Sequence, residues 1–374
     1  MIWKSSLRAR RRLSFLSRAT VFLSTICFFP VTVNMNNSQA HFSFFSFKTS
    51  IYFVVFVCGG LIIIGVFIPF YPDLYTDFLT VFFTVNNYVD IVSLIFFFSS
   101  LYLVIPLSSL ILASSFPHLT PLSLHHNLKT PRNWVSLFLM IFSTFLGSLL
   151  IVVGIYLGMM DRMNKDRSLV SSEMIAYIVA PYASILFPQL SWCISVILAS
   201  LWISQYCEMC SSVPDQDLLS WARNCFLLYH SIEEHLGSFL CFVFSLSQVF
   251  WIFTLYVGVT GYFSNYSMTS TMCYSAGMGL YSLGILANVV GFSALLETAH
   301  QALHNIIPTL QDHSMGVEDS KHMLRLSYTL RDIERARPIT GKGLFQIDRS
   351  LVTGMVSVAV TYIIILAQFR ISLD

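Results

Sequence analysis

WVSLFLMIFSTFLGSLLIVVGIYLGM, residues 134–159, is the stretch that decides the fold, because none of its side chains carries a formal charge. A helix of about 20 apolar residues is long enough to cross the hydrocarbon core of a bilayer. The whole chain has the same character: 55% of its 374 residues are hydrophobic and 11% are charged, with a mean hydropathy of +0.70. Soluble domains carry about 25% charged residues, so the composition excludes a soluble protein.

Six further apolar stretches predict an all-α membrane protein with seven transmembrane helices. The stretch at 79–116 is too long for one crossing, so we expect it to project into the cytoplasm. The basic N-terminus leads into a weakly apolar stretch at 19–33. We interpret it as a short helix before the first span, not as a cleaved signal, because Pro30 interrupts it and it has no clean small-residue cleavage site. The predicted spans are 50–70, 79–116, 134–159, 174–204, 236–263, 272–296 and 351–369.

The distribution of Lys and Arg predicts the orientation. With a cytoplasmic N-terminus and seven spans, 17 of the 21 Lys and Arg residues fall on the inner side and four on the outer side. Cytoplasmic loops of membrane proteins carry such an excess, so the C-terminus is expected to be extracellular. The tripeptide beginning at Asn265 is a glycosylation acceptor pattern, and this orientation places it in a short outer loop. A second such tripeptide at 36–38 falls inside and should stay unmodified.

The polar stretches divide the chain into four parts. Residues 205–235 and 299–349 are polar, compatible with helix, and matched by no outer loop of similar size. We therefore expect the fourth, fifth and sixth helices to continue into the cytoplasm as an anchoring bundle. The predicted parts are a cytoplasmic N-terminal segment at 1–48, a six-helix transmembrane bundle at 49–298, a cytoplasmic anchor segment at 299–349, and the seventh helix with a short extracellular tail at 350–374.

The seventh predicted helix carries one polar stripe. At 100° per residue, one narrow face holds small, hydroxyl and amide side chains, and the opposite face is wholly apolar. An unpaired polar group is costly in hydrocarbon, so the stripe needs a partner. The stripe consists of Ser350, Gly354, Ser357, Thr361 and Gln368, and the apolar face of Met355, Val356, Ala359, Ile363, Leu366 and Ala367.

Two interpretations of this stripe remain open from the residues alone. Small and hydroxyl side chains can pack one membrane helix against another. They can also wet the wall of an aqueous pore, which a short apolar ring closes by excluding water. Ile365 and Phe369 lie at the outer end of the stripe, where they could form such a ring around Gln368. A single helix cannot enclose a pore, so this second interpretation requires several chains around an axis.

The end of the chain resembles the insect gustatory receptor family. Residues 361–369, TYIIILAQF, are similar to the family's Thr-Tyr, five mostly aliphatic residues, and Gln-Phe. Residues 343–349, GLFQIDR, resemble the family's Gly-x-Phe segment before the last helix. The match lies on the seventh predicted span at the extreme C-terminus, and the rest of the chain is similar only in topology and size.

The resemblance implies a ligand-gated cation channel in the plasma membrane of a sensory neuron. Four subunits, identical or related, would place their seventh helices around one central pore. Ile365 and Phe369 would form the hydrophobic gate, and Gln368 a polar ring beside it. Thr361 and Tyr362 would be signature positions below the gate, with Ser357 further down the pore wall. A tastant such as a sugar or another small organic molecule would bind in the outer half of each six-helix bundle at 49–298.

Several polar and aromatic side chains are candidates for the ligand pocket. Asp90, beside two asparagines, lies within a predicted span, where a carboxylate must face the bundle interior or a water-filled cavity. It could equally be a hydrogen-bonded structural residue. Aromatic side chains with a polar tip suit small organic ligands, but they suit interface belts and packing as well. The aromatic candidates are Tyr182, Trp251, Tyr256 and Tyr281.

The titratable clusters predict neither a metal site nor an enzyme. Glu297, His300 and His304 share one helical face, and a second His/Glu cluster lies at 230–235. Neither completes a paired Glu-x-x-His pattern, and polar residues are common at the membrane edge. The sequence contains no nucleophile elbow, phosphate loop or His-Glu-x-x-His motif, and no basic patch interleaved with aromatics for nucleic acid. We expect no cofactor.

Two other classes of membrane protein were weighed. A G-protein-coupled receptor would need an outer N-terminus, against the charge bias, and the chain lacks an Asp-Arg-Tyr ending on the third span and Asn-Pro-x-x-Tyr on the seventh. A transporter would favour weak symmetry between the halves of the chain, and none is evident. A non-channel membrane scaffold remains an alternative.

Overall fold

The computed structural model describes residues 32–34, 39–43, 46–54, 105–123, 133–162, 171–213, 217–262, 268–314 and 320–371. The first predicted span, near 50–70, and most of the second therefore lie outside the described residues. So do Asp90, Asn265 and the second acceptor tripeptide, and the side chain of Phe369 is not described.

Long helices make up most of the described chain. Each predicted span from 134 onward lies within a helix, except that the fifth reaches one residue past its helix, and the helices are mostly longer than the spans. They are α8 (Trp134–Arg162), α9 (Ser171–Ser211), α10 (Leu218–Tyr262), α11 (Met268–His304) and α14 (Arg349–Ile371). The inner part of the second span is α7 (Ile105–Ser123), and α3 (Phe47–Phe53) begins just before the first predicted span.

The lengths of the helices show that several extend beyond a bilayer. At 1.5 Å per residue, the 41 residues of α9 and the 45 of α10 measure about 62 and 68 Å. The hydrocarbon core is about 30 Å thick. Within the described residues, four helices are long and apolar enough to cross a membrane: Trp134–Gly158, Pro188–Ser211, Leu218–Tyr256 and Met268–Asp312. The protein is thus a multi-pass membrane protein.

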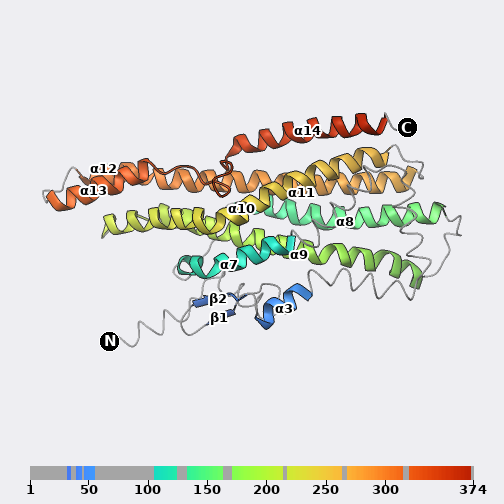
Figure 1. The fold of residues 1–374 in the computed structure, drawn as a ribbon, viewed down its shortest axis with the longest axis horizontal. Coiled ribbons are helices and arrows are strands. Elements are labelled where there is room, and N and C mark those ends of the chain that lie inside the picture. Colours follow the sequence, from blue (N-terminus) through green and yellow to red (C-terminus); the bar gives the residue numbers. More distant parts are fainter. Residues whose placement is uncertain are drawn as a thin grey trace.

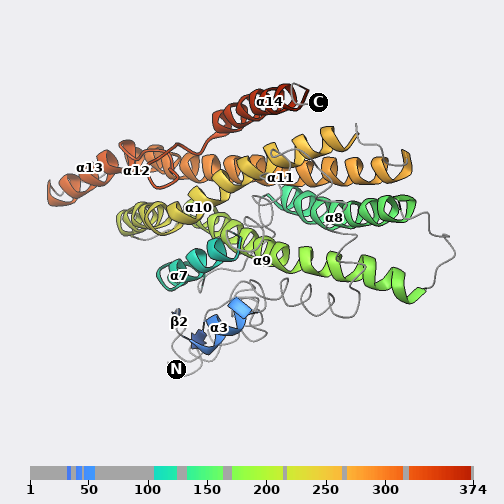
Figure 2. The same ribbon diagram turned by 45° about the vertical axis from the view of Figure 1, so that its right-hand side comes forward.

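The helices run along one common direction, and the chain doubles back between them (Figure 1). The two short helices α12 (Ile306–Ser314) and α13 (Ser320–Glu334) lie together at one end of the molecule, continuing the line of α11. From there the chain returns, and α14 runs toward the opposite end. Figure 2, turned by 45°, shows α14 along the edge of the bundle beside α10 and α11, with α9 and α7 on the far side.

Close backbone contact joins α8 to α11. A Cβ placed on Gly277 would lie 2.7 Å from the Ile151 nitrogen and 2.8 Å from the Gly147 carbonyl oxygen. A Cβ on Gly291 would lie 2.5 Å from the Ser136 Cβ. Small residues permit this approach, which is the usual way that membrane helices pack tightly. The α8–α11 pair therefore has no room for relative sliding or separation without loss of packing.

The largest hydrophobic core lies toward the end of the molecule that carries α12 and α13. It combines the C-terminal half of α9, the N-terminal half of α10 and the C-terminal part of α11, and it includes the fully buried Trp202, Tyr206 and Phe239. Ile339 and Ile347, from the connection between α13 and α14, join the same core. The long helices therefore pack against one another well beyond the length of a membrane crossing.

Two local features differ from uninterrupted helix. The helix of α11 ends at His304, and α12 starts at Ile306. Pro308 lacks an N–H and its ring clashes with the carbonyl four residues earlier, which explains the break. The expected all-α fold also contains a short hairpin, in which β1 (Thr32–Asn34) pairs antiparallel with β2 (Gln39–His41). Thr32 and Val33 had been assigned to a short helix at 19–33, but both are β-branched and favour strand.

Candidate functional site

The start of α14 is fixed by a capping carboxylate. The Asp348 Oδ1 accepts hydrogen bonds from the Ser350 nitrogen at 2.9 Å and the Leu351 nitrogen at 3.1 Å. The Ser350 hydroxyl donates to the same oxygen at 2.5 Å. This satisfies two of the free N–H groups at the helix N-terminus. The Ser350 hydroxyl and, less strongly, the backbone N–H groups lower the pKa of Asp348, because each favours the charged carboxylate.

The connection from α13 to α14 is a tight loop whose glycines have defined roles. Gly343 has φ of +78°, a conformation that side chains rarely adopt. Gly341 lies so close to the Phe345 ring that an added Cβ would be 2.7 Å from it. The Gly341 nitrogen donates to the Phe345 carbonyl at 2.9 Å, and the Ile347 nitrogen to the Ile339 carbonyl at 3.0 Å. The Gly-x-Phe pattern of the sequence therefore forms a turn, which is closed by hydrogen bonds within the loop.

This loop and α14 lie along one face of α10. We call that face the α10 track; its residues are spaced by about one or two helical turns, which places them in one row. The track contacts the loop first and then the first half of α14. Its contacts are Tyr229 Oη to the Arg337 carbonyl at 2.8 Å, Thr340 Oγ1 to Glu233 Oε1 at 3.0 Å, Gly237 beside Thr340 and Lys342, Phe244 edge-on to Phe345, and Gln248 Nε2 to the Met355 carbonyl at 3.0 Å.

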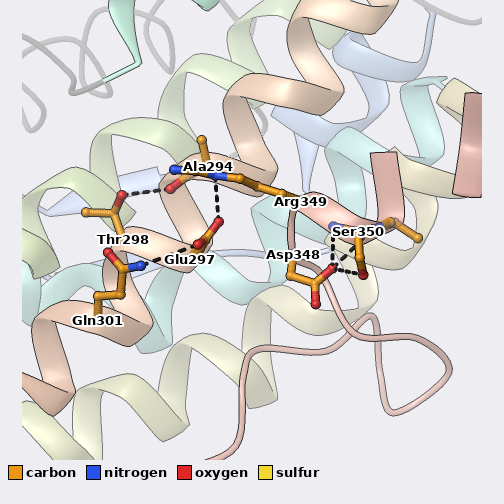
Figure 3. A network of polar contacts seen from close by, with 8 residues as sticks. Ala294, Glu297, Thr298, Gln301, Asp348, Arg349 and Ser350 are labelled. Carbon is orange, nitrogen blue, oxygen red and sulfur yellow. Dashed lines mark hydrogen bonds and ion pairs between the residues drawn. The ribbon is translucent and has the colours of Figure 1, made fainter. Parts of the chain in front are cut away.

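An ion pair ties the first residue of α14 to α11. The Arg349 Nε lies 2.8 Å from the Glu297 Oε2, and Gln301 donates to the other carboxylate oxygen at 3.3 Å (Figure 3). A cation is disfavoured at a helix N-terminus, where the dipole is positive. The Glu297 carboxylate offsets this cost. The ion pair therefore explains why an arginine occupies the first turn of α14.

The polar stripe of α14 faces away from its own subunit. Met355 and Ala359, on the apolar face, are buried against the bundle, with 8% and 0% exposure. Tyr362 and Ile365 are exposed as well, the latter at 39%. The helix is therefore bound along one edge only. All five stripe residues are exposed: Ser350, Gly354, Ser357, Thr361 and Gln368.

The hydroxyls on the stripe have a defined polarity. Ser357 Oγ donates to the Thr353 carbonyl at 3.0 Å, and Thr361 Oγ1 donates to the Ser357 carbonyl at 2.9 Å. Each hydroxyl hydrogen is therefore directed back into the helix, and the oxygen lone pairs remain available to the outside. A row of outward acceptors favours the hydration shell of a cation over that of an anion.

The aromatic candidates for a ligand pocket are mostly buried in helix contacts. Trp251, Tyr256 and Tyr281 are buried, and Tyr182 is half-buried with its hydroxyl donating to the Phe145 carbonyl at 3.3 Å.

Sequence reasoning missed the polar network around Tyr281. Gln189 of α9 donates to the Tyr281 hydroxyl at 3.0 Å and accepts from Ser148 of α8 at 3.0 Å. A buried glutamine among apolar neighbours is the signal that could have identified it. The network joins α8, α9 and α11.

The His/Glu cluster on α11 has other partners. Glu297 binds Arg349, as described above. The His300 Nδ1 lies 3.0 Å from the Tyr229 hydroxyl, and the His304 ring packs edge-on against His300 with centroids 4.5 Å apart. Within the described ranges, no three metal-ligating side chains come together.

The arrangement defines a class of fold: a bundle of long membrane helices that extends past the bilayer and carries its C-terminal helix along one edge. Insect olfactory receptors have this fold. The chain is similar to the insect olfactory receptor OR5 from Machilis hrabei in complex with eugenol, with a TM-score of 0.55 and 15% identity over 79% of this chain and 87% of that one. A second structure of the same receptor gives a TM-score of 0.48, with the same identity and coverage.

The comparison establishes the fold and leaves the ligand open. No sequence profile of a known protein family matches the chain. At 15% identity, the likeness shows the fold alone.

Proposed function

We propose that this chain is a gustatory-receptor-like subunit of a ligand-gated cation channel. Four subunits, identical or related, surround one axis, and α14 of each lines the pore. The observation that carries the proposal is the exposure of the polar stripe on α14, opposite the face that Met355 and Ala359 bury. If the stripe served packing within one subunit, it would be covered by the subunit's own helices. Among the helices that the structure describes, none covers the stripe.

The chemistry of the stripe supports cation permeation. The hydroxyl oxygens of Ser357 and Thr361 turn their lone pairs outward, and Gln368 adds an amide near the outer end. Ile365 and Phe369 provide the apolar ring that closes the pore in the absence of ligand. Residues 299–349 form the cytoplasmic anchor that joins subunits, the N-terminus lies inside the cell and the C-terminus outside, and Asn265 is a glycosylation site.

The ligand in this proposal is a sugar or another small organic molecule. It binds in the outer half of the bundle at 49–298, near Asp90 and the aromatic candidates Tyr182, Trp251, Tyr256 and Tyr281. The eugenol bound by the related olfactory receptor is a small organic molecule, which agrees with a ligand of this size. The protein acts in the plasma membrane of a sensory neuron.

Cysteine accessibility combined with current recording tests the pore. The chain is expressed alone in a cell without endogenous chemoreceptors, and currents are recorded against a panel of sugars and small organic compounds. Ser357→Cys and Thr361→Cys are then treated with a charged thiol reagent from the cytoplasmic side. We expect the reagent to change the current through both, because both positions face the water column.

Met355→Cys is the matched control, because Met355 lies on the opposite face of the same helix and is buried against the bundle, at 8% exposure. The reagent should leave its current unchanged. Equal modification at all three positions, or at none in a conducting channel, would refute the pore assignment. Tagging both termini in intact cells separates the proposal from a G-protein-coupled receptor, which requires an outer N-terminus.

A further inference from the structure

Among the described residues, Gln248 makes the one side-chain hydrogen bond from the α10 track to α14, in the first half of that helix. Its amide nitrogen donates to the Met355 carbonyl at 3.0 Å. A carbonyl within a helix keeps a second lone pair after its helical bond, so it can accept this additional hydrogen bond. Beyond Met355, the side-chain hydrogen bonds recorded for the described part of α14 stay within the helix, at Ser357 and Thr361.

The amide oxygen of Gln248, unlike its nitrogen, does not stabilise the structure. Its Oε1 is buried without a hydrogen-bond partner among the described residues. An unpaired amide oxygen costs free energy in an apolar bundle, whereas a leucine of similar size would pack there without that cost. The hydrogen bond to Met355 fixes where α14 lies, whereas the unpaired amide oxygen lowers the stability of the bundle. We therefore infer that Gln248 positions α14 more than it stabilises the bundle.

We propose that Gln248 is a positioning residue that holds the first half of α14 outward against α10 and thereby favours the conducting channel. The proposal rests on the proposed function, in which the exposed stripe of α14 faces a shared axis. Every contact between α14 and its own subunit then pulls the helix away from that axis. The Gln248 bond resists the approach of the pore helices to one another, which is the movement that narrows the pore.

The expected effect follows from the strength of hydrogen bonds between membrane helices. Removing one such bond shifts an equilibrium by roughly threefold to tenfold. Gln248→Met keeps the volume and removes the N–H donor. In proteoliposomes that contain the purified full-length channel, basal thallium influx without ligand should therefore fall by about threefold to tenfold relative to the wild type.

Three further variants show whether the effect belongs to the hydrogen bond. Ser247→Ala is the matched control: Ser247 is the neighbouring residue, is buried, and has a hydroxyl without a partner in the described structure. Its influx should match the wild type. Gln248→His retains an N–H donor and should restore most of the influx. Gln248→Asn is shorter by one methylene, should lower the influx, and replaces Gln248→Met if that variant does not fold.

Hydrogen exchange of the peptide at 351–360 tests the contact without relying on conduction. Gln248→Met should accelerate exchange in this peptide by about threefold to tenfold, and Ser247→Ala should not. Unchanged exchange overturns the contact as a restraint. Accelerated exchange with unchanged or increased influx overturns the outward role. If the wild type conducts no better than empty liposomes and shows no current with any compound, the proposed function fails, whereas the exchange result still decides the contact.

Discussion

The ion pair between Glu297 and Arg349 offers a quantitative test of how α14 is held at its base. We consider the single variants Glu297→Gln and Arg349→Gln and the double variant. Each single change removes the charge pair and keeps a polar side chain of similar length. If the pair acts as one unit, the double variant should be no worse than the more severe single variant.

The expected coupling is modest because both groups contact water. The Nε–Oε2 distance of 2.8 Å is favourable, but the Arg349 side chain is 74% exposed and the Glu297 side chain 28%. Solvent-exposed pairs contribute about 0.2–1 kcal/mol, which corresponds to a factor of about 1.4 to 5 in an equilibrium constant. The coupling should shrink when the ionic strength is raised, because salt screens exposed charges.

The assay compares the half-maximal concentration of one activating compound across the four proteins, with surface expression measured in parallel. Gln301→Ala serves as the control, since Gln301 makes only a 3.3 Å hydrogen bond to the same carboxylate. The reasoning fails if the effects of Glu297→Gln and Arg349→Gln simply add. It also fails if the coupling exceeds about 2 kcal/mol, because an exposed pair cannot supply that free energy.

Two further predictions concern stability, measured as the melting temperature of the purified protein in detergent. Gly277→Val should lower it by several degrees or abolish folding, because a Cβ would lie 2.7 Å from the backbone of α8; Gly279→Ala, where nothing lies within 4 Å, should be neutral or stabilising. Asp348→Ala should cost about 0.5–2 kcal/mol through loss of the N-cap. Since the hydrogen bonds from Ser350 lower the pKa of Asp348, its contribution should be present at neutral pH and be lost as the pH falls through that lowered pKa.

Periodicity predicted the helices well, because membrane spans are long and their apolar residues continuous. The predicted span at 134–159 lies in α8, and most of the polar stretch at 205–235 lies in α9 and α10, which are 41 and 45 residues long. The polar stripe on α14 was also predictable, because the helical period of 3.6 residues can be recognised from the sequence alone. The break between α11 and α12 near Pro308 was not predicted.

The contacts of the candidate site were not predictable, because they join residues far apart in the sequence. Glu297 and His300 share one helical face, and the structure gives each a different partner, Arg349 and Tyr229. The sequence spacing of residues on one helix shows which side chains share a face. It does not show which part of the chain covers that face. Gln248 carried no motif at all; only the position of the Met355 carbonyl gives it a role.

The contrast between two helix contacts indicates where this protein can move. The α8–α11 contact brings backbones so close that an added Cβ would lie under 3 Å from its neighbours, and such packing has no second arrangement at low cost. The α14 contact consists of the buried Met355 and Ala359 and the partly buried Leu351 and Val352, with polar ties at Arg349 and at Gln248. Each of these polar contacts changes the equilibrium between two positions of α14 by a factor of only a few. A ligand with a modest preference for one position could therefore shift α14 without disturbing the bundle. The movable element is therefore expected to be the helix that bears the polar stripe, and the rest of the bundle the frame against which it moves.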